Sequence, residues 1–334
     1  MNVFELTHQL INIESITGNE LAVGKQLASI LQDLCDRFDG RLEIFEVEPN
    51  RNNVLATFGD PIVTFSTHMD TVPPYFPSRE DDEFIWGRGA CDTKGIIASM
   101  ITAVEALLSE GVRNLALLFV VGEERNSAGA YFAAKTPRGS KYLINGEPTE
   151  NQLALGSKGA MRLEIETSGR MSHSAYPELG DSAINKLLDV LQDIRALEFP
   201  TDPVLGNSTV NIGTISGGRA PNVVPDCAKA ELLIRLIDDG ERVRQIIDRC
   251  VNGRATVREM LCIPALRLKS FDGFRTAVMK YTTDIPAFNG AWGEPLLIGP
   301  GTIHVAHTSE ERVPKRELTE AVELYQKLAR RLLA

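Results

Sequence analysis

The sequence predicts an α/β protein whose central sheet is mixed and mostly parallel. Helical and strand patterns alternate along the first half of the chain, and Leu115–Val121 is a continuous apolar run, as in a strand buried on both faces. From about residue 158 the pattern changes to that of a compact α+β unit. With 334 residues, the chain is long enough for two domains.

In the first half, apolar residues at helical spacing predict helices at the start of the chain, at residues 20–38 and at residues 94–110. Short apolar runs predict the strands Val54–Phe58, Ile62–Ser66, Leu115–Val121 and Tyr142–Ile144. Strands that alternate with helices in this way indicate a sheet covered on both faces.

In the second unit, apolar and charged residues alternate from Met161 to Thr167, which is typical of a half-buried strand in an antiparallel sheet. The further elements that we expect are a helix at Ser182–Leu197, strands at Thr209–Ile215 and Ala228–Leu236, and helices near Arg242–Val251 and at residues 316–333. Periodicity alone leaves open whether the second unit is inserted in the first or follows it.

Composition argues against several classes of protein. The 35 basic and 45 acidic residues give a net charge of −10, which disfavours nucleic acid as a partner. The five cysteines include no C-x-x-C pair, so we expect neither a zinc ribbon nor a disulfide framework. The start of the chain lacks the pattern of a signal peptide, and no stretch approaches 18 consecutive apolar residues. We therefore expect a cytoplasmic protein with no membrane partner.

Polar clusters follow the predicted buried strands. They are His68 with Asp70, Glu123 with Glu124, and Glu147, while Asp92 precedes a predicted helix. Ligand sites form at the carboxyl ends of strands in open α/β sheets. Acidic groups that converge there repel one another unless a cation lies between them, and zinc accepts both imidazole nitrogen and carboxylate oxygen. The clusters therefore predict a metal site, although each pair alone is more often structural or solvated.

Two phosphate-binding interpretations fail. Gly87 and Gly89 lack the third glycine of a dinucleotide-binding loop, and Lys94 lacks the context of a Walker A motif.

Seven motifs occur in order along nearly the whole chain. They are Ser66-Thr-His-Met-Asp-Thr-Val-Pro-Pro74, Gly87-Arg-Gly-Ala-Cys-Asp-Thr-Lys-Gly95, Val121-Gly-Glu-Glu124, Gly146-Glu-Pro-Thr149, Gly169-Arg-Met-Ser-His-Ser174, Asn222-Val-Val-Pro225, and Gly299-Pro-Gly301 with His307-Thr-Ser-Glu-Glu311. Together they resemble the M20 metallopeptidase family, which includes acetylornithine deacetylase, succinyl-diaminopimelate desuccinylase, aminoacylase and carboxypeptidase G2. The resemblance implies a zinc-peptidase-like catalytic domain (1–157 and 266–334) with an inserted ferredoxin-like lid and dimerisation domain (158–265).

The resemblance also implies the metal ligands. Asp92 resembles the carboxylate that bridges two zinc ions, with His68 and Glu147 on one ion and Glu124 and His307 on the other. His304 lies three residues before His307 and is the alternative ligand, but His307 matches the family motif. Cobalt or manganese is possible with the same ligands. Family structures further imply a cis peptide after Asp92.

The catalytic roles follow from the same resemblance. Asp70 resembles the carboxylate that orients His68, and Glu123 resembles the general base. Two zinc ions would lower the pKa of a shared water towards about 7, and Glu123 would take its proton and pass it to the leaving amine. His173 resembles a histidine that stabilises the oxyanion from the partner subunit of a homodimer, the alternative being a surface-loop histidine.

For the substrate, the resemblance implies an N-acyl amino acid. Arg235 resembles the arginine that holds the α-carboxylate, with Asn222 nearby. Arg170 resembles an arginine of the desuccinylases that could meet a succinyl carboxylate. We expect hydrolysis of a linear amide bond that removes an acetyl or succinyl group, of the acetylornithine deacetylase or succinyl-diaminopimelate desuccinylase type.

Two alternatives remain. One is a dipeptidase or carboxypeptidase with the same metal chemistry. The other is a non-catalytic metal-binding protein, which the complete ligand set disfavours. The stretch Pro264–Gly290 matches no motif.

Overall fold

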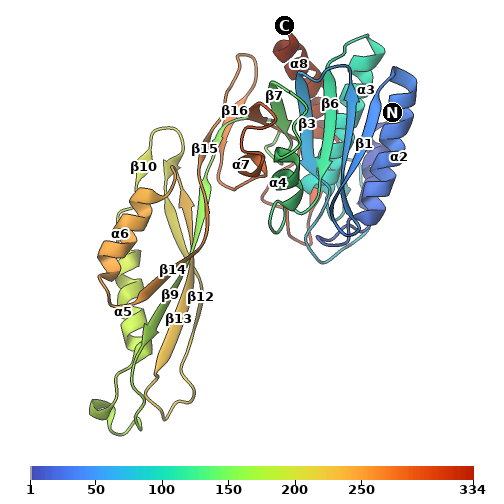
Figure 1. The fold of residues 1–334 in the computed structure, drawn as a ribbon. Coiled ribbons are helices and arrows are strands. Elements are labelled where there is room, and N and C mark those ends of the chain that lie inside the picture. Colours follow the sequence, from blue (N-terminus) through green and yellow to red (C-terminus); the bar gives the residue numbers. More distant parts are fainter. Residues whose placement is uncertain (1) are drawn as a thin grey trace. The chain divides into compact units, whose positions relative to one another are not determined.

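The computed structural model describes residues 2–334, and the chain divides into two compact units (Figure 1). Unit 1 comprises Met1–Ala154, Leu268–Ala277 and Thr283–Ala334, and unit 2 comprises Leu155–Arg267 and Val278–Thr282. Unit 2 is therefore inserted in unit 1, which periodicity left open. From the sequence we expected residues 266–334 to belong entirely to the catalytic domain, which corresponds to unit 1. The segment Val278–Thr282 departs from this because β16 (Thr276–Met279) lies beside β8 (Leu153–Ser157) in a three-stranded sheet.

Unit 1 is built on a six-stranded mixed sheet with the order β1-β2-β6-β3-β7-β17. The strands are β1 (Arg41–Glu48), β2 (Arg51–Phe58), β3 (Val63–His68), β6 (Leu115–Val120), β7 (Tyr142–Asn145) and β17 (Glu294–Leu297). From β6 to β17 all neighbours are parallel, while β1 pairs with β2 and β2 with β6 in antiparallel fashion. The predicted fold class is confirmed.

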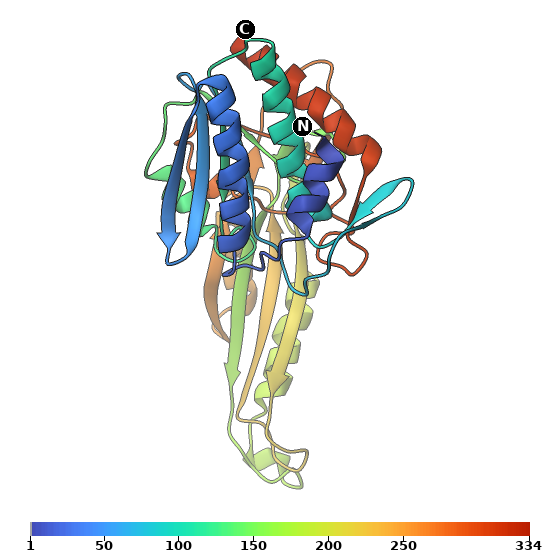
Figure 2. The same ribbon diagram turned by 90° about the vertical axis from the view of Figure 1, so that its right-hand side faces the viewer.

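Helices cover both faces of this sheet (Figures 1 and 2). One face packs against α1 (Val3–Ile11), α2 (Leu21–Phe38), α3 (Gly95–Ser109) and α8 (Lys315–Leu333), and the other packs against α4 (Ala128–Ala134) and α7 (Ile285–Phe288). Alternate residues of β6 belong to different apolar cores: Leu117 packs with the first group of helices and Leu118 with the second. This explains the continuous apolar run, because every side chain of the strand is buried.

Unit 2 has the element order of a ferredoxin-like fold. Its elements are β9 (Gly159–Ser168), α5 (Ala183–Arg195), β12 (Thr209–Gly217), β13 (Cys227–Leu236), α6 (Glu241–Val251) and β14 (Thr256–Ile263). The four strands form an antiparallel sheet with the order β12-β13-β9-β14. Both helices pack on one face and share an apolar core with alternate strand residues.

The remaining elements are short. They are β4 (Arg79–Glu80), β5 (Phe84–Trp86), β10 (Thr201–Asp202), β11 (Gly206–Asn207), β15 (Leu266–Arg267), β18 (Arg312–Pro314), the π-helical turn η1 (Ala90–Lys94) and the 3₁₀ turn η2 (Pro177–Leu179). Within residues 2–334, no helix has the length and apolar character that crossing a bilayer requires.

Candidate metal centre

The polar clusters lie at the carboxyl ends of neighbouring parallel strands. His68 is the last residue of β3 and pairs in register with Val120, the last residue of β6. Glu123 and Glu124 follow β6 by a short turn, and Glu147 follows the end of β7. Strand register therefore brings these side chains to one edge of the sheet.

Asp92 completes this arrangement from the turn η1, directly before α3. The peptide bond between Asp92 and Thr93 is cis, as the resemblance implied. The Thr93 hydroxyl donates to the carbonyl oxygen of His68 at 2.5 Å, which joins the turn to the end of β3.

Short distances relate the metal-binding groups. Among the described residues, His68, Asp92 and Glu124 offer ligand atoms that all lie within 4.8 Å of one another. His68 Nε2 is 3.0 Å from Asp92 Oδ1, whereas His307 Nε2 is 3.3 Å from Asp92 Oδ2 and 3.0 Å from Glu124 Oε1. The two oxygens of Asp92 thus face different imidazoles, as suits a carboxylate shared by two cations. His304 is exposed and makes no comparable contact in the part of the chain that the structure describes.

Glu147 adds an unsatisfied oxygen to this group. The residue is 4% exposed, and its Oε1 is buried without a hydrogen-bond partner among residues 2–334. A buried, unpartnered carboxylate oxygen is costly unless a cation or proton meets it. Imidazole nitrogen together with carboxylate oxygen is the donor set that zinc and similar divalent cations prefer. The residues present therefore fit a metal centre.

Electrostatics show an excess of negative charge at this edge. Burial raises the pKa of Glu123 and of Glu147 well above the usual range, and neighbouring carboxylates raise both further. Burial opposes ionisation of Asp92 as well, but hydrogen bonds from His307 and His68 hold its pKa below the ordinary value. Hydrogen bonds with Asp92 and Glu124 raise the pKa of His307 to about 10. The carboxylates outnumber the two imidazoles, so additional positive charge would stabilise the site.

Asp70 contacts two of the polar clusters, namely its neighbour His68 and the turn that carries Glu123 and Glu124. Its carboxylate accepts hydrogen bonds from the backbone N–H groups of Gly122 (2.9 Å), Glu123 (3.1 Å) and Glu124 (3.3 Å), and from the Thr17 hydroxyl (2.8 Å). His68 Nδ1 lies 2.9 Å from the carbonyl oxygen of Asp70 and 3.5 Å from its carboxylate. The main contact that orients His68 is therefore the backbone of Asp70, and the carboxylate chiefly holds the Glu123–Glu124 turn.

Glu311 has no role assigned from the sequence, yet it joins the Asp92 turn to the segment of His307. Its Oε1 accepts from the N–H groups of Gly89 (2.9 Å) and Asp92 (3.3 Å), and its Oε2 lies 2.5 Å from Arg88 Nη1. Both side chains of this ion pair are 1% exposed. The last residue of the seventh motif signalled Glu311, but no pattern indicated that Arg88 is its partner.

Asp284 is a further acidic residue that no motif indicated. It is 1% exposed, and neither carboxylate oxygen makes a hydrogen bond of normal geometry with a described residue, although the nearby Ser127 hydroxyl lowers its pKa. Burial, opposed in part by the charge of His68, raises the pKa of Asp284 to about 7. Its charge in turn raises the pKa of Glu123 and Glu147, so Asp284 belongs to the same electrostatic environment.

In unit 2 the predicted substrate-binding residues lie at opposite ends of the sheet. His173 and Arg170 follow the end of β9, and the Ser174 N–H donates to the carbonyl oxygen of Asn222 at 3.0 Å, so Asn222 lies beside His173 and not near Arg235 as expected. Arg235 pairs in register with Ala160, eight residues before Ser168, which is about 26 Å along a strand that rises about 3.3 Å per residue. Within one chain, a single amino-acid ligand therefore cannot contact both groups.

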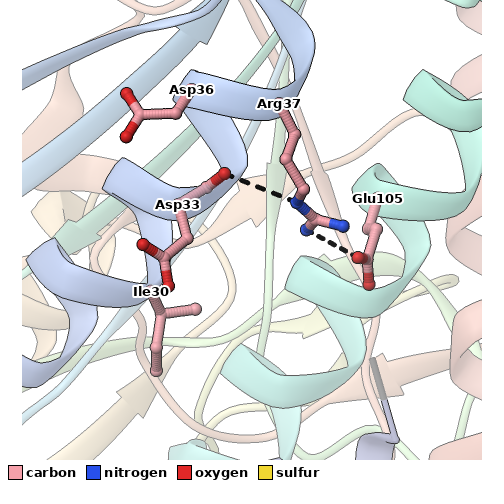
Figure 3. Close-up of a pocket in the computed structure, with 5 residues that line it drawn as sticks. All are labelled: Ile30, Asp33, Asp36, Arg37 and Glu105. Atoms are coloured by element: carbon pink, nitrogen blue, oxygen red, sulfur yellow. Dashed lines mark hydrogen bonds and ion pairs between the residues drawn. The ribbon is translucent and has the colours of Figure 1, made fainter.

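A surface pocket elsewhere on unit 1 contains an ion pair between Arg37 and Glu105. Figure 3 shows this pocket between α2 and α3, where Arg37 donates to the carbonyl oxygen of Asp33 and forms a 2.6 Å ion pair with Glu105. Asp36 and Ile30 complete its lining. The predicted site residues all lie outside this pocket.

Comparisons with known proteins agree with the motifs. Residues 155–254 match the profile of the M20-type peptidase dimerisation domain. A peptidase M20 domain-containing protein of Schizosaccharomyces pombe is 36% identical over 98% of this chain and 84% of its own length. A probable carboxypeptidase of Talaromyces marneffei is 35% identical over 98% of this chain and 85% of its own length.

Solved structures share the fold. The aminopeptidase PepT from Bacillus cereus superposes with a TM-score of 0.81 at 19% identity, covering 99% of this chain and 98% of that one. A dinuclear metal-binding peptidase of the M20 family from Bacillus subtilis gives a TM-score of 0.69 at 17% identity, covering 98% and 96% of the two chains. The similarity in sequence to the yeast protein extends over nearly the whole chain, and so this protein belongs to the M20 peptidase family, whose members are hydrolases of amide bonds.

Proposed function

We propose that this protein is a two-metal hydrolase that cleaves the amide bond before a residue with a free α-carboxylate, in the manner of a carboxypeptidase or dipeptidase. The observation that carries the proposal is the placement of Asp92, whose two oxygens face His68 and His307 separately. The names of the similar fungal carboxypeptidases support the choice of a peptide substrate over an N-acyl amino acid.

The chain offers a complete set of ligands for two divalent cations. Asp92 would be shared, His68 and Glu147 would bind one ion, and Glu124 and His307 would bind the other. When bound, such ions act as Lewis acids and make water a nucleophile at neutral pH. The dinuclear site of the Bacillus subtilis peptidase, a member of the same family, supports two ions rather than one.

Glu123 is the residue that we propose as general base and acid. Burial and neighbouring carboxylates raise its pKa well above the usual range, which makes it a stronger base than an exposed glutamate. It would accept a proton from the attacking water and return it to the nitrogen of the leaving amine. Asp70 would support this role, because its carboxylate holds the backbone N–H of Glu123 at 3.1 Å.

Unit 2 supplies the proposed contacts to substrate. Arg235 would hold the α-carboxylate, since guanidinium binds carboxylate in bidentate fashion. His173 would stabilise the oxyanion from the partner subunit of a homodimer, together with Asn222. The exposed apolar side chains of Met171, Tyr176 and Leu179 near His173 support a covered surface there. The match to a peptidase dimerisation domain supports the same assembly.

Removal of an acetyl or succinyl group from an amino acid is the second candidate function. The observation that favours it is Arg170, which is exposed; within residues 2–334 its side chain donates one hydrogen bond, from Nε to the carbonyl oxygen of Leu179 at 2.9 Å. A guanidinium with free Nη groups close to His173 could bind the carboxylate of a succinyl group.

The test is metal analysis followed by a substrate panel. The purified protein, freed of metal with a chelator and reloaded with zinc, cobalt or manganese, would be assayed on dipeptides, longer peptides, and N-acetyl and N-succinyl amino acids. We expect metal-dependent cleavage of peptides with a free carboxyl terminus and none of the same peptides with an amidated terminus. Turnover of N-acyl amino acids alone would favour the second candidate.

Substitution of Glu123 tests the catalytic assignment. Glu123→Gln keeps the shape of the side chain but removes its basic oxygen, so we expect kcat to fall by about 10²- to 10⁴-fold with the metal content unchanged. The same change at Glu323, an exposed residue of α8, is the control and should leave kcat unaltered. Equal turnover by Glu123→Gln and the parent protein would refute the assignment.

A further inference from the structure

One face of the sheet in unit 2 carries charged side chains instead of helices. Alternate residues of β9 and β13, such as Leu163 and Leu232, pack into the core with α5 and α6. The residues between them point to the opposite face, because side chains alternate along a strand. On this helix-free face, every strand except the edge strand β12 contributes a cation that is paired with an acid.

These ion pairs cross between neighbouring strands. Arg162 Nε donates to Glu231 at 3.0 Å, Lys229 lies 3.3 Å from Glu164, and Arg258 lies 2.8 Å from Glu164. Cross-strand pairs of opposite charge are an ordinary way to stabilise a sheet. The charges in the middle of this face are therefore balanced within the sheet itself.

Arg235 is the exception on the same face. It lies beside Ala160 on β9 and Thr209 on β12, neither of which carries charge. It forms no ion pair or hydrogen bond through its side chain with any residue from 2 to 334. It is also half-buried, and this burial lowers its pKa. A guanidinium that loses part of its hydration without gaining an acidic partner costs free energy, which an anion would recover.

Two lysines are brought to the same end of the sheet. Lys158 precedes Ala160 by two residues and is only 6% exposed. Its backbone N–H donates to the carbonyl oxygen of Met279 at 2.9 Å, which places Lys280, the next residue, beside this strand. The positive charges of Lys280 and Arg235 add to the effect of burial in lowering the pKa of Lys158. Lys158 therefore lies close enough to each of the other two cations to be repelled by it.

No acid neutralises these three cations within the described chain. The Nζ of Lys158 donates to the carbonyl oxygen of Asn207, and Lys280 has no ion pair. Asp202, the acid of the hairpin that carries Asn207, is already paired with Arg267. A positive charge that is buried, concentrated and unpaired differs from the balanced pairs on the rest of the face, and it indicates a binding site for an anion.

We infer that Lys158, Arg235 and Lys280 form one anion site in unit 2, which selects a substrate whose carboxyl-terminal residue carries two carboxylates, that is aspartate or glutamate. The inference rests on the proposed function, in which Arg235 holds the α-carboxylate. The lysines are the new part. One carboxylate would leave two of the three cations without a counter-charge, whereas an acidic side chain supplies the second negative group.

The test compares peptides that differ only in the charge of the last side chain. Peptides ending in glutamate and in glutamine have nearly the same shape, as do those ending in aspartate and asparagine. Charged hydrogen bonds contribute enough for us to expect kcat/KM of the metal-loaded protein to be at least about tenfold higher for the acidic member of each pair. A ratio near one would overturn the inference.

Substitutions of single lysines test whether the preference for acidic peptides comes from this anion site. Lys280→Gln removes an exposed charge, so we expect it to fold and to reduce the glutamate-to-glutamine ratio by about tenfold with little change for the glutamine peptide. Lys229→Gln is the matched control, since it removes a lysine of the same sheet that is paired with Glu164, and it should leave the ratio unchanged. An equal loss on both peptides in Lys280→Gln would refute the role of this lysine.

A binding measurement tests this inference independently of the proposed catalytic function. If the protein hydrolyses no peptide, the proposed function fails. Glutarate should still bind to the full-length chain more tightly than butyrate in a calorimetric titration. Lys280→Gln should lower the affinity for glutarate and leave that for butyrate unchanged. If inorganic phosphate bound more tightly than glutarate and lost affinity in the same variant, the site would be one for phosphate and the dicarboxylate assignment would be wrong.

Discussion

The carboxyl edge of the sheet in unit 1 and the Lys158–Arg235 end of the sheet in unit 2 are opposites in charge. The first collects carboxylates of Asp92, Glu123, Glu124 and Glu147 around two imidazoles. The second collects cations with no acid beside them in the described chain. By contrast, the buried guanidinium of Arg51 is neutralised by its bidentate contact with Glu20.

This contrast distinguishes buried charges that only stabilise the fold from buried charges that bind a ligand. A folded chain balances a buried charge when the charge serves only stability, because an unpaired one costs several kcal/mol. Imbalance of one sign therefore indicates a bound group of the other sign. In unit 1 the missing charge is positive, which suits metal ions, and in unit 2 it is negative, which suits carboxylates.

The two regions also differ in the contacts that hold their charged side chains in place. The acidic edge is held by buried groups that are not themselves ligands, chiefly Asp70 and the pair Arg88–Glu311. Within residues 2–334, the basic end in unit 2 is held by the strand register, by the hydrogen bond from the Lys158 N–H to Met279 and by the contact of Lys158 with Asn207. Catalytic groups have to be placed precisely, whereas charge selection tolerates looser geometry.

The largest expected effect comes from breaking a balanced pair. Arg88→Met leaves Glu311 buried without its counter-charge, so we expect a loss of about 3–5 kcal/mol in the free energy of unfolding, measured by urea denaturation. Glu311→Gln added to this variant removes the stranded charge and keeps an acceptor for the N–H groups of Gly89 and Asp92. The double variant should therefore recover part of the loss. A loss below about 1 kcal/mol in Arg88→Met would contradict the view that this pair supports the Asp92 turn.

A smaller effect is expected at the support of the metal ligands. Asp70→Asn replaces one acceptor oxygen by an N–H₂ group, so the backbone N–H groups of Gly122, Glu123 and Glu124 can no longer all be satisfied. We expect metal affinity to fall by about 10- to 100-fold, measured by competition with a fluorescent chelator. Asp33→Asn on the exposed side of α2 is the control and should leave affinity unaltered. Unchanged affinity in Asp70→Asn would show that this carboxylate does not act on the metal.

The smallest effect is expected on the balanced face of unit 2. Arg162→Gln removes one member of an exposed cross-strand pair with Glu231, and such pairs contribute at most about 1 kcal/mol. We expect the midpoint of thermal unfolding and the preference for acidic peptides both to stay close to those of the parent protein. A marked loss of that preference would mean that the whole face, rather than the three cations at its end, binds the substrate.

Much of the fold was accessible from the sequence. Continuous apolar runs located β2, β3, β6 and β7, because strands buried on both faces need apolar residues throughout. The same reasoning did not find β1 and β14, which are edge strands with mostly exposed or half-buried side chains. It also missed α7 and β17, which have four residues each and contain a proline, a residue that disfavours both helix interiors and strands.

In the candidate site, too, some residues could be predicted from the sequence and others could not. His68, Asp92, Glu123, Glu124, Glu147 and His307 were found because each lies in a local motif, and their residue types alone suggest metal chemistry. Asp284 was missed, since a single aspartate in a stretch without a motif resembles any helix-capping residue. The partnership of Arg88 with Glu311 spans more than two hundred positions, and no local pattern reports so distant a contact.

By itself, the sequence determined the fold class, the family, and the residue types that would form a metal centre. Hydrophobic periodicity and short motifs are local properties, which the sequence shows directly. Only the tertiary structure decided that Asp92 faces two different imidazoles, that Asp70 holds the Glu123–Glu124 turn, and that Arg235 lacks an acidic partner. These facts depend on strand register and on contacts between distant segments, so charge balance becomes visible only once the chain has folded.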